Sequence, residues 1–328
     1  MQTQPDHNTP ALPDQDLPQT VVILLATYRG EDYIDTQLDS IAAQSHPHWR
    51  LIVSDDSPDD LTREKVRHFS AGRPAGQVQL IDGPRKGATQ NFLHLLQQAP
   101  EGQMLAFCDQ DDRWLPEKLA HAVKALSSHP GPAHYAARTI VADENLNPIT
   151  ETRHFRRPLT FRNALVQACM AGNTSVFNAP AASILKQGTG SARDAGVISH
   201  DWWAYQLTSG AGATMIHDAT PALLYRQHPQ SEMGRNDTAG AMARRVGMLF
   251  AGDYGDWLAA NTRALLDSQH LLTSENAATL QGFADALRQR GPGSAASLWR
   301  LGLYRQTKIG TAALFAAAGF GRLLRNQP

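Results

Sequence analysis

The run Val21-Val22-Ile23-Leu24-Leu25-Ala26-Thr27-Tyr28 decides the fold of this chain. Its first five residues are β-branched or aliphatic with no polar residue between them, which is typical of a central parallel strand buried on both faces. An amphipathic helix follows, in which Ile34, Leu38 and Ile41 recur at helical spacing. The sequence therefore predicts a strand followed by a crossover helix, the unit from which parallel sheets are built.

The same alternation continues for about 120 residues. Apolar runs predict further strands at 49–53, 78–81 and 104–108, and helical patterns predict helices at 61–69 and 88–98. Strands alternating with helices favour an α/β fold with a doubly wound, mostly parallel sheet flanked by helices. Further strands are expected at 134–141, 174–177 and 223–227, a turn at 143–147, and a Gly- and Ser-rich loop at 187–196.

Polar residues follow each strand of the first half. In such sheets ligands bind beyond the carboxyl ends of the strands, so these residues should converge along one edge. This convergence is the strongest inference that the pattern supports. The clusters are Thr27 with Tyr28, Asp55 with Asp56, Arg85 with Lys86, and the segment from Asp109 to Asp112.

Asp109 and Asp111 are separated by one residue at a strand end, where two carboxylates can share one hard divalent cation such as Mg or Mn. Phosphate oxygens would complete the shell, and the metal would offset charge on a departing diphosphate. A solvated acidic turn is the alternative. The position after a buried strand, in line with three other polar strand ends, favours the metal site.

The other clusters leave two interpretations open. Asp55 and Asp56 could accept hydrogen bonds from a base or a ribose, although Asp-Ser-Pro-Asp is also good turn chemistry. Tyr28 could stack on a nucleobase or pack in the core. Lys86 could neutralise phosphate or remain a surface charge.

A second constellation is His200-Asp201-Trp202-Trp203. If Asp201 is desolvated at the start of a helix, its pKa could rise and it could act as a general base. The alternative is that Asp201 is an N-cap residue and that the two tryptophans after it belong to the core. Tyr225-Arg226-Gln227-His228 places an arginine and a histidine together, either for phosphate or metal contact or in a structural role.

Composition narrows the function classes. A net charge of -1 gives no indication of nucleic-acid binding. Two cysteines outside any C-x-x-C pair argue against a disulfide framework or zinc knuckle. The polar, proline-rich residues 1–19 predict a disordered lead-in rather than a signal peptide, and no apolar run is long enough to span a membrane. We expect a cytoplasmic protein.

Taken in order, these motifs resemble the family 2 glycosyltransferases of the GT-A fold, particularly a bacterial rhamnosyltransferase-like branch. The resemblance covers about residues 20–235, which we take as the catalytic domain, with 236–328 as a helical C-terminal region. The matching segments are 26–31, 37–44, 54–57, 83–92, 107–119, 200–203 and 225–228.

The resemblance implies a role for each segment. The nucleotide donor would be bound by Thr27, Tyr28, Asp55, Asp56 and Lys86. Asp109 would lie near the ribose or the diphosphate and share the metal, for which Asp111 would be the main ligand, and His228 would join the metal site. Asp201 would deprotonate an acceptor hydroxyl for one inverting displacement, with His200, Trp202 and Trp203 on the acceptor side. Two departures lie near the nucleotide pocket: Arg29 stands where the family commonly has asparagine, and Ser57-Pro58 where it commonly has Gly-Ser.

The implied donor is dTDP-rhamnose or a UDP-sugar, and the implied acceptor is a glycan or a lipid-linked saccharide. Residues 309–324, apolar with flanking basic residues, could lie on a membrane surface or pack on the domain or on a second copy in a homo-oligomer. Two other functions stay open: a nucleotidyltransferase, although its glycine-rich basic loop is missing after the first strand, and a non-catalytic carbohydrate-binding protein.

Overall fold

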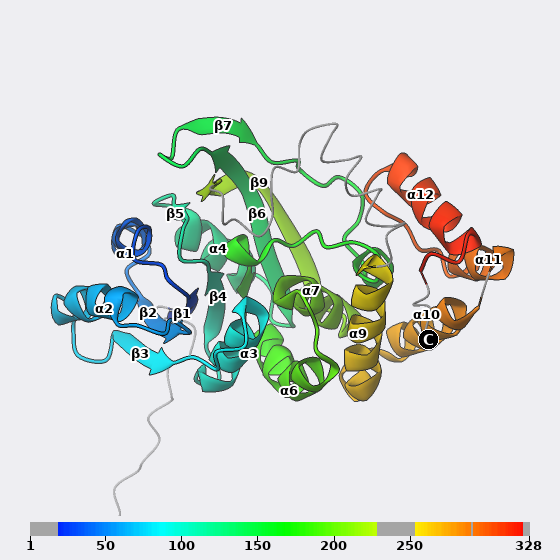
Figure 1. The fold of residues 1–328 in the computed structure, drawn as a ribbon, viewed down its shortest axis with the longest axis horizontal. Coiled ribbons are helices and arrows are strands. Elements are labelled where there is room, and N and C mark those ends of the chain that lie inside the picture. The colour runs from blue at the N-terminus through cyan, green and yellow to red at the C-terminus, as the bar shows by residue number, and fades with distance from the viewer. Residues whose placement is uncertain (1–18, 228–252, 290, 324–328) are drawn as a thin grey trace, which may run out of the picture.

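The computed structural model describes residues 19–227, 253–289 and 291–323, and Figure 1 shows a twisted sheet with helices on both faces. The predicted alternation is present in the first half. Every residue of the first strand is buried, as its apolar run requires. The bounds are β1 Val21–Thr27, α1 Ile34–Ala42, β2 Trp49–Asp55, α2 Leu61–Ala71, β3 Val78–Asp82, α3 Ala88–Gln98 and β4 Met104–Cys108.

The second half adds strands of both directions and most of the helices. After β4 come β5 Arg113–Trp114, α4 Lys118–Ser127, β6 Ala133–Ala142, β7 Pro148–Glu151, α5 Phe161–Ala164, the 3-10 turn η1 Gly172–Thr174 and β8 Val176–Phe177. They are followed by α6 Ala179–Ala195, α7 His200–Gly210 and β9 Thr214–Arg226. Beyond residue 252 lie α9 Asp253–Asp267, η2 Gln269–Leu271, α10 Ser274–Arg288, α11 Pro292–Arg300 and α12 Lys308–Gly319.

The sheet runs in the order β3-β2-β1-β4-β8-β6-β9-β5, with β7 paired to β6. Neighbours among β3, β2, β1 and β4 are parallel. Both β4 and β6 are antiparallel to β8, so they point the same way, and β9 is parallel to β6. The carboxyl ends of β2, β1, β4, β6 and β9 therefore face one side, which confirms the mostly parallel sheet.

Alternate residues of β1 enter two hydrophobic layers, because successive side chains of a strand point to opposite faces. Ile23 and Leu25 pack with α1, α2 and α4, whereas Val22 and Leu24 pack with α3, α6 and α7. The second layer also contains buried residues of α9, α10 and α12. The predicted boundary at residue 235 thus separates two segments that share one core.

The C-terminal helices lie at the end of the molecule opposite α1 and α2 (Figure 1). Helix α12 buries Leu314, Ala317 and Ala318, so the part of 309–324 that the structure describes packs on the domain. Large apolar side chains remain exposed around it. No helix within the described residues is long and apolar enough to cross a bilayer.

Two sequence-based expectations about elements are wrong. The segment 187–195 is the second half of α6 rather than a loop, and Gly196 caps the helix in the left-handed conformation. The glycines permit close packing, because a Cβ on Gly188 would lie 2.4 Å from Leu207 Cδ2 on α7. Strand β9 begins at Thr214, nine residues before the expected start at 223. Its polar first half pairs with β6, which apolar patterning does not reveal.

Candidate functional site

The predicted polar clusters meet at the carboxyl edge of the parallel strands. Thr27 is paired in register with Asp55, and Asp55 with Asp82 on the next strand. Leu25 of β1 is paired with Cys108, which directly precedes Asp109. The topology of the sheet therefore brings together residues that are up to about 80 positions apart in the sequence, as predicted.

Asp55 is fully buried and its carboxylate is occupied by protein groups. One oxygen accepts hydrogen bonds from Thr27 Oγ1 at 2.7 Å and Ser57 Oγ at 2.8 Å. The other pairs with Arg63 Nε at 2.9 Å, and the same guanidinium also pairs with Asp82. Asp55 thus ties together the ends of β1, β2 and β3. Arg63 was missed by sequence reasoning, because a helical arginine gives no sign of this long-range contact.

Asp56 is also buried but has a free acceptor. Its Oδ1 accepts from Arg85 N at 2.7 Å, and no described residue hydrogen-bonds Oδ2. Arg85 has a φ of 55°, in the left-handed region that side chains rarely adopt. The turn after β3 is therefore held against Asp56, and the second carboxylate oxygen remains able to accept from a ligand.

Tyr28 is 54% exposed at the end of β1. Its backbone is bound to the Asp109–Asp111 loop, because Gln110 Oε1 accepts from Tyr28 N at 2.9 Å and Gln110 Nε2 donates to Tyr28 O at 3.0 Å. The neighbouring Gly30 leaves no room for a Cβ, which would lie 2.3 Å from Gln110 Oε1. The exposed ring is available for stacking, and the loops on either side of the edge are joined.

The two departures from the family pattern contact each other. Arg29 has a φ of 48°, a conformation that asparagine tolerates better than arginine, and its backbone N donates to Ser57 Oγ at 2.8 Å. Ser57 in turn donates to Asp55. The serine that replaces glycine therefore supplies a hydrogen bond to the residue that replaces asparagine.

Four aspartates gather where β4 ends. Burial, then the charges of Asp112, Asp111 and Asp201, raise the pKa of Asp109 well above its usual range. Burial and the charge of Asp111 raise the pKa of Asp112 to about 8. Mutual repulsion among hard oxygen donors is the environment that a divalent cation relieves.

Asp112, one of these four aspartates, is buried and held by hydrogen bonds. It accepts from Asn173 Nδ2 at 2.7 Å, and Asn173 O accepts from Lys118 Nζ at 2.6 Å. Burial lowers the pKa of Lys118 to about 7, while its ammonium lies 3.3 Å from the Trp114 ring centroid. Lys118 belongs to the motif after the Asp pair, but its burial could not be read from the sequence.

Arg226, the last residue of β9, binds the loop that carries the aspartates. Its Nε donates to Asp111 O at 2.8 Å, its backbone N donates to Asp112 Oδ1 at 3.3 Å, and its Nη1 donates to Glu144 O. The guanidinium is 5.0 Å from the Tyr33 ring centroid. The sequence left Arg226 open between a phosphate or metal contact and a structural role, and the structure shows it bound to the backbone of the aspartate loop.

Asp201 lies in the first turn of α7, close enough for its charge to raise the pKa of Asp109. It accepts hydrogen bonds from Gly172 N at 3.1 Å, Trp202 N at 2.7 Å and the Ser199 hydroxyl. Ser199, not Asp201, is the N-cap of the helix. The structure therefore joins Asp201 to the carboxylate cluster, which the sequence left open.

His200 is held between aromatic rings. Its ring stacks on Phe92 at 3.8 Å between centroids and meets Phe107 edge-on at 5.1 Å. Burial lowers its pKa to about 4, although the charge of Asp201 acts in the opposite direction. A Cβ on Gly172 would lie 2.9 Å from His200 Nε2 and 3.1 Å from Asp201 Cβ. His200 is therefore a neutral packing element beside Asp201.

The structure corrects the placement of the two tryptophans on the acceptor side. Trp202 is 3% exposed and Trp203 is fully buried, so neither side chain reaches a ligand. Trp202 Nε1 donates to Ala164 O at 2.7 Å, and its ring stacks on Tyr254 at 5.8 Å. Both pack in the core, because large apolar side chains on the inner face of α7 gain more from burial than from exposure.

Two residues that were predicted to bind the donor or the metal are not placed in the site described above. Lys86 is exposed after β3, and His228 lies outside the described residues. Throughout the described part of the chain, no three His, Cys, Asp or Glu side chains form a group that could hold a metal ion. Asp109 and Asp111 offer hard oxygens and excess negative charge, so they fit a divalent cation whose shell a phosphate ligand helps to complete.

Comparison with known proteins identifies a family. The model of "Glycosyl transferase family 2" matches residues 22–187, just over half of the 328-residue chain. The match spans the strand ends and the aspartate loop described above.

Two curated relatives illustrate the similarity. The chain is 24% identical over 233 residues to the dTDP-rhamnosyl transferase RfbG of Shigella flexneri, covering 69% of this chain and 78% of that protein. It is 35% identical over 100 residues to the Escherichia coli UDP-Glc:alpha-D-GlcNAc-diphosphoundecaprenol beta-1,3-glucosyltransferase WfgD, covering 30% of this chain and 38% of that one.

Solved structures give more distant likenesses. Residues 1–349 of S. aureus TarS, in complex with UDP-GlcNAc, align with a TM-score of 0.47 at 15% identity, covering 87% of this chain and 93% of that one. The mannosyltransferase PcManGT of Pyrobaculum calidifontis, with GDP-Man and Mn2+, aligns with a TM-score of 0.47 at 21% identity, covering 94% and 88%. Likenesses of this size do not establish a shared substrate.

Proposed function

The chain belongs to glycosyltransferase family 2, and we propose that it is an inverting, metal-dependent member that transfers a sugar to a lipid-linked saccharide. It is a transferase of the GT-A fold that takes its sugar from a nucleotide donor, which confirms the resemblance drawn from the sequence motifs. Family membership also decides against the nucleotidyltransferase and the non-catalytic alternatives.

One observation carries the inverting, metal-dependent part of the proposal. Asp201 and the pair Asp109 and Asp111 converge, from α7 and from the end of β4, closely enough for their charges to interact. Asp111 and Asp109 would hold a divalent cation, which would stabilise the negative charge of the departing nucleoside diphosphate. Asp201 lies near Asp109 and would accept the proton of the acceptor hydroxyl.

The nucleotide is assigned to the neighbouring strand ends. The exposed ring of Tyr28 would stack on the base, and the free Oδ2 of Asp56 would accept from it. Asp55 would position these groups rather than touch the donor, because its carboxylate is already bound to protein donors. Lys86 would lie near the phosphates.

The proposed donor and acceptor rest on the relatives. RfbG is named a dTDP-rhamnosyl transferase, which supports dTDP-rhamnose as the first donor to test, with UDP-sugars next. The name of WfgD includes a diphosphoundecaprenol-linked sugar, which supports an acceptor joined to lipid through diphosphate.

The decisive experiment compares two variants that remove different functions. Asp111→Asn should lose both sugar transfer and the metal-dependent rise in melting temperature caused by the donor. Asp201→Asn should keep that thermal shift but lose roughly 10²–10⁴-fold in kcat. Asp39→Asn removes an exposed carboxylate on α1 and serves as the control. Full transfer by Asp111→Asn would refute the metal assignment.

We also propose that the C-terminal helices contact the membrane surface. Trp299, Ile309 and Phe320 are 70%, 74% and 76% exposed, and each has a basic residue within two positions in the sequence. Replacing Trp299 and Phe320 by serine should weaken co-sedimentation with anionic vesicles. Unchanged sedimentation would refute this contact.

A further inference from the structure

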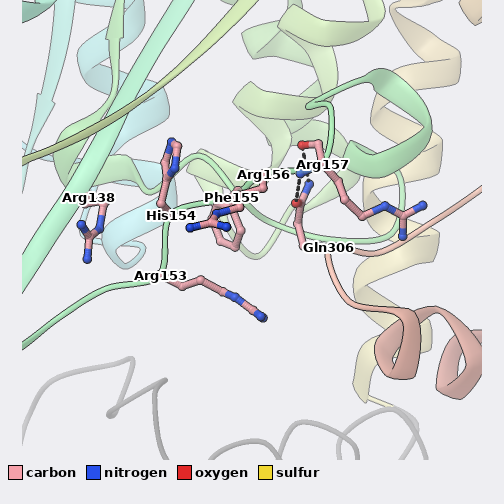
Figure 2. Close-up of a pocket in the computed structure, with 7 residues that line it drawn as sticks. All are labelled: Arg138, Arg153, His154, Phe155, Arg156, Arg157 and Gln306. Atoms are coloured by element: carbon pink, nitrogen blue, oxygen red, sulfur yellow. Dashed lines mark hydrogen bonds between the residues drawn. The ribbon is translucent and has the colours of Figure 1, made fainter.

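A cavity of about 560 Å³ shares no lining residue with the carboxylate site (Figure 2). Its volume is within the range of roughly 300–1,000 Å³ typical of small-molecule sites. Its described lining is basic and contains no acidic side chain. The lining residues are Arg138, Arg153, His154, Phe155, Arg156, Arg157 and Gln306.

Protein contacts hold two of the four arginines in place. Arg138 of β6 donates from Nε to Thr152 O at 2.7 Å, and its Nη2 pairs with Glu151 at 2.6 Å. Arg157 stacks its guanidinium over the Tyr304 ring, 4.4 Å from the centroid. Both side chains therefore keep fixed positions, which reduces the entropy lost when a ligand binds.

Gln306, from the loop between α11 and α12, closes one wall of the cavity. Its Oε1 accepts from Arg157 N at 3.1 Å and its Nε2 donates to Arg157 O at 3.2 Å, as the dashed lines in Figure 2 show. Its own backbone N donates to Gln167 Oε1 at 2.7 Å. The wall thus joins segments that lie about 150 residues apart in the sequence.

The positive charge of the cavity is poorly compensated. Arg153 and Arg156 are exposed and have no hydrogen-bond or ion-pair partner within the described residues, and Glu151 pairs only with Arg138. Beside the cavity, burial first and then the charges of His154 and Arg138 lower the pKa of His217 to about 4, although the charge of Asp218 acts in the opposite direction. Clustered guanidiniums repel one another unless an anion lies between them.

We propose that this cavity binds the diphosphate group through which the acceptor saccharide is joined to its lipid. Diphosphate oxygens match the planar fork of guanidinium donors, and several arginines together select a multiply charged group over a neutral sugar. The inference rests on the proposed function, because it assigns a place to the acceptor of that reaction.

The two sites lie along the same strand. Arg138 precedes Ala142, the last residue of β6, by four residues, or roughly 13 Å at the rise of a β-strand. Ala142 is paired with Arg226, which binds the aspartate loop. In the proposed arrangement, the acceptor places its diphosphate in the cavity and its sugar extends along β6 toward the aspartate loop.

Calorimetric titration with inorganic pyrophosphate in EDTA tests the cavity directly, because without metal the aspartate site repels anions. The wild-type protein should bind pyrophosphate, and Arg153→Gln/Arg156→Gln should bind it at least about tenfold more weakly. Arg50→Gln/Arg300→Gln removes two exposed arginines elsewhere and should bind as the wild type does. Equal binding by all three proteins, or none by the wild type, would overturn the proposal.

Sedimentation with vesicles that contain phosphatidylglycerol tests whether the cavity binds ordinary lipid headgroups rather than a lipid-linked diphosphate. The double variant Arg153→Gln/Arg156→Gln should sediment with these vesicles as the wild type does. If it loses vesicle binding but keeps pyrophosphate binding, the cavity serves headgroups and the diphosphate assignment is wrong.

A transfer assay distinguishes failure of this inference from failure of the proposed function. With a diphosphate-linked acceptor, the double variant should show a raised KM for the acceptor and an unchanged KM for the donor. If the wild type transfers no sugar, the proposed function fails, while the pyrophosphate titration still decides whether the cavity binds diphosphate.

Discussion

The carboxylate site and the arginine cavity differ in charge and in how the chain builds them. The first combines four aspartates from the end of β4 and the start of α7, whose negative charges raise one another's pKa values. The second combines four arginines from β6 and the segment after β7, closed by the loop before α12. In the proposed division, the donor's diphosphate is held through a metal ion and the acceptor's through guanidinium groups.

Both sites extend beyond the part of the chain that the family model matches. Asp109, Asp111 and Asp112 lie within the matched residues, at the end of a strand of the parallel sheet, whereas Asp201 lies beyond them. The four arginines of the cavity also lie within the matched residues, and Gln306 lies far beyond them. Each site therefore needs a residue from the second part of the chain.

Among the changes that separate the two sites without removing a proposed ligand, Gly172→Ala should have the largest effect, and it should damage the carboxylate site alone. The new Cβ would lie 2.9 Å from His200 Nε2 and 3.1 Å from Asp201 Cβ, so Asp201 must move. We expect kcat to fall by roughly tenfold to a hundredfold, while pyrophosphate binding in EDTA is unchanged. Gly190→Ala, with no atom within 4 Å of the added Cβ, should leave kcat unaltered. Normal turnover by Gly172→Ala would show that the position of Asp201 does not matter.

Gln306→Ala should have a smaller effect, and it should act on the arginine cavity rather than on the carboxylate site. Loss of the two hydrogen bonds to Arg157 should loosen the cavity wall and raise the acceptor KM by roughly fivefold to tenfold, without changing the donor KM. Steady-state kinetics with each substrate varied in turn provide the measurement. Gln281→Ala, an exposed position on α10, is the matched control. A change in donor KM instead would contradict the division between the sites.

The smallest effects should appear in two histidines, one beside each site. Burial lowers the pKa of both His200 and His217 to about 4. The charge of Asp201 raises the pKa of His200, so Asp201→Asn should lower that pKa further. The charge of Arg138 lowers the pKa of His217, so Arg138→Gln should raise that pKa. NMR titration of the ring protons would detect both shifts, and shifts of the same sign would contradict the opposite fields.

The same two histidines affect how the free energy of unfolding changes with pH in acid. Between the ordinary histidine value of about 6.5 and the folded value of about 4, the unfolded chain binds more protons than the folded one. The two histidines therefore contribute a decrease in the free energy of unfolding as the pH falls through this window, whereas the raised pKa values of Asp109 and Asp112 contribute in the opposite direction. Arg138→Gln should weaken the decrease, because it brings the folded pKa of His217 closer to the unfolded one.

The first half of the fold could be read from the sequence because each strand is an apolar run that ends in polar residues. The strand at Met104–Cys108 was predicted with its observed bounds. The glycines of α6 were misread as a loop, since only tertiary packing shows that Gly188 lets two helices approach. The first half of β9 was missed for a related reason: its pairing with β6, not its hydropathy, makes it a strand.

The candidate site was predicted as a set of residues rather than as a set of contacts. Asp109, Asp111 and Asp201 were chosen from motifs, whereas the burial of Trp202 and Trp203 and the internal pairing of Asp55 depend on partners distant in the chain. The arginine cavity gave no usable signal, because arginines at 153–157 have no spacing typical of a site until the C-terminal loop closes over them.

The hydrogen bonds between Gln110 and the backbone of Tyr28 have a consequence for directed evolution. The middle residue of the Asp-Gln-Asp triplet is not a spacer, because it fastens the loop that would read the base to the loop that would hold the diphosphate. A substitution at Tyr28 keeps both backbone groups, whereas a change that moves the backbone at Tyr28 also moves the loop of the aspartates. Mutant libraries can therefore vary the side chain at Tyr28 alone, but those that insert or delete residues after β1 have to vary both loops together.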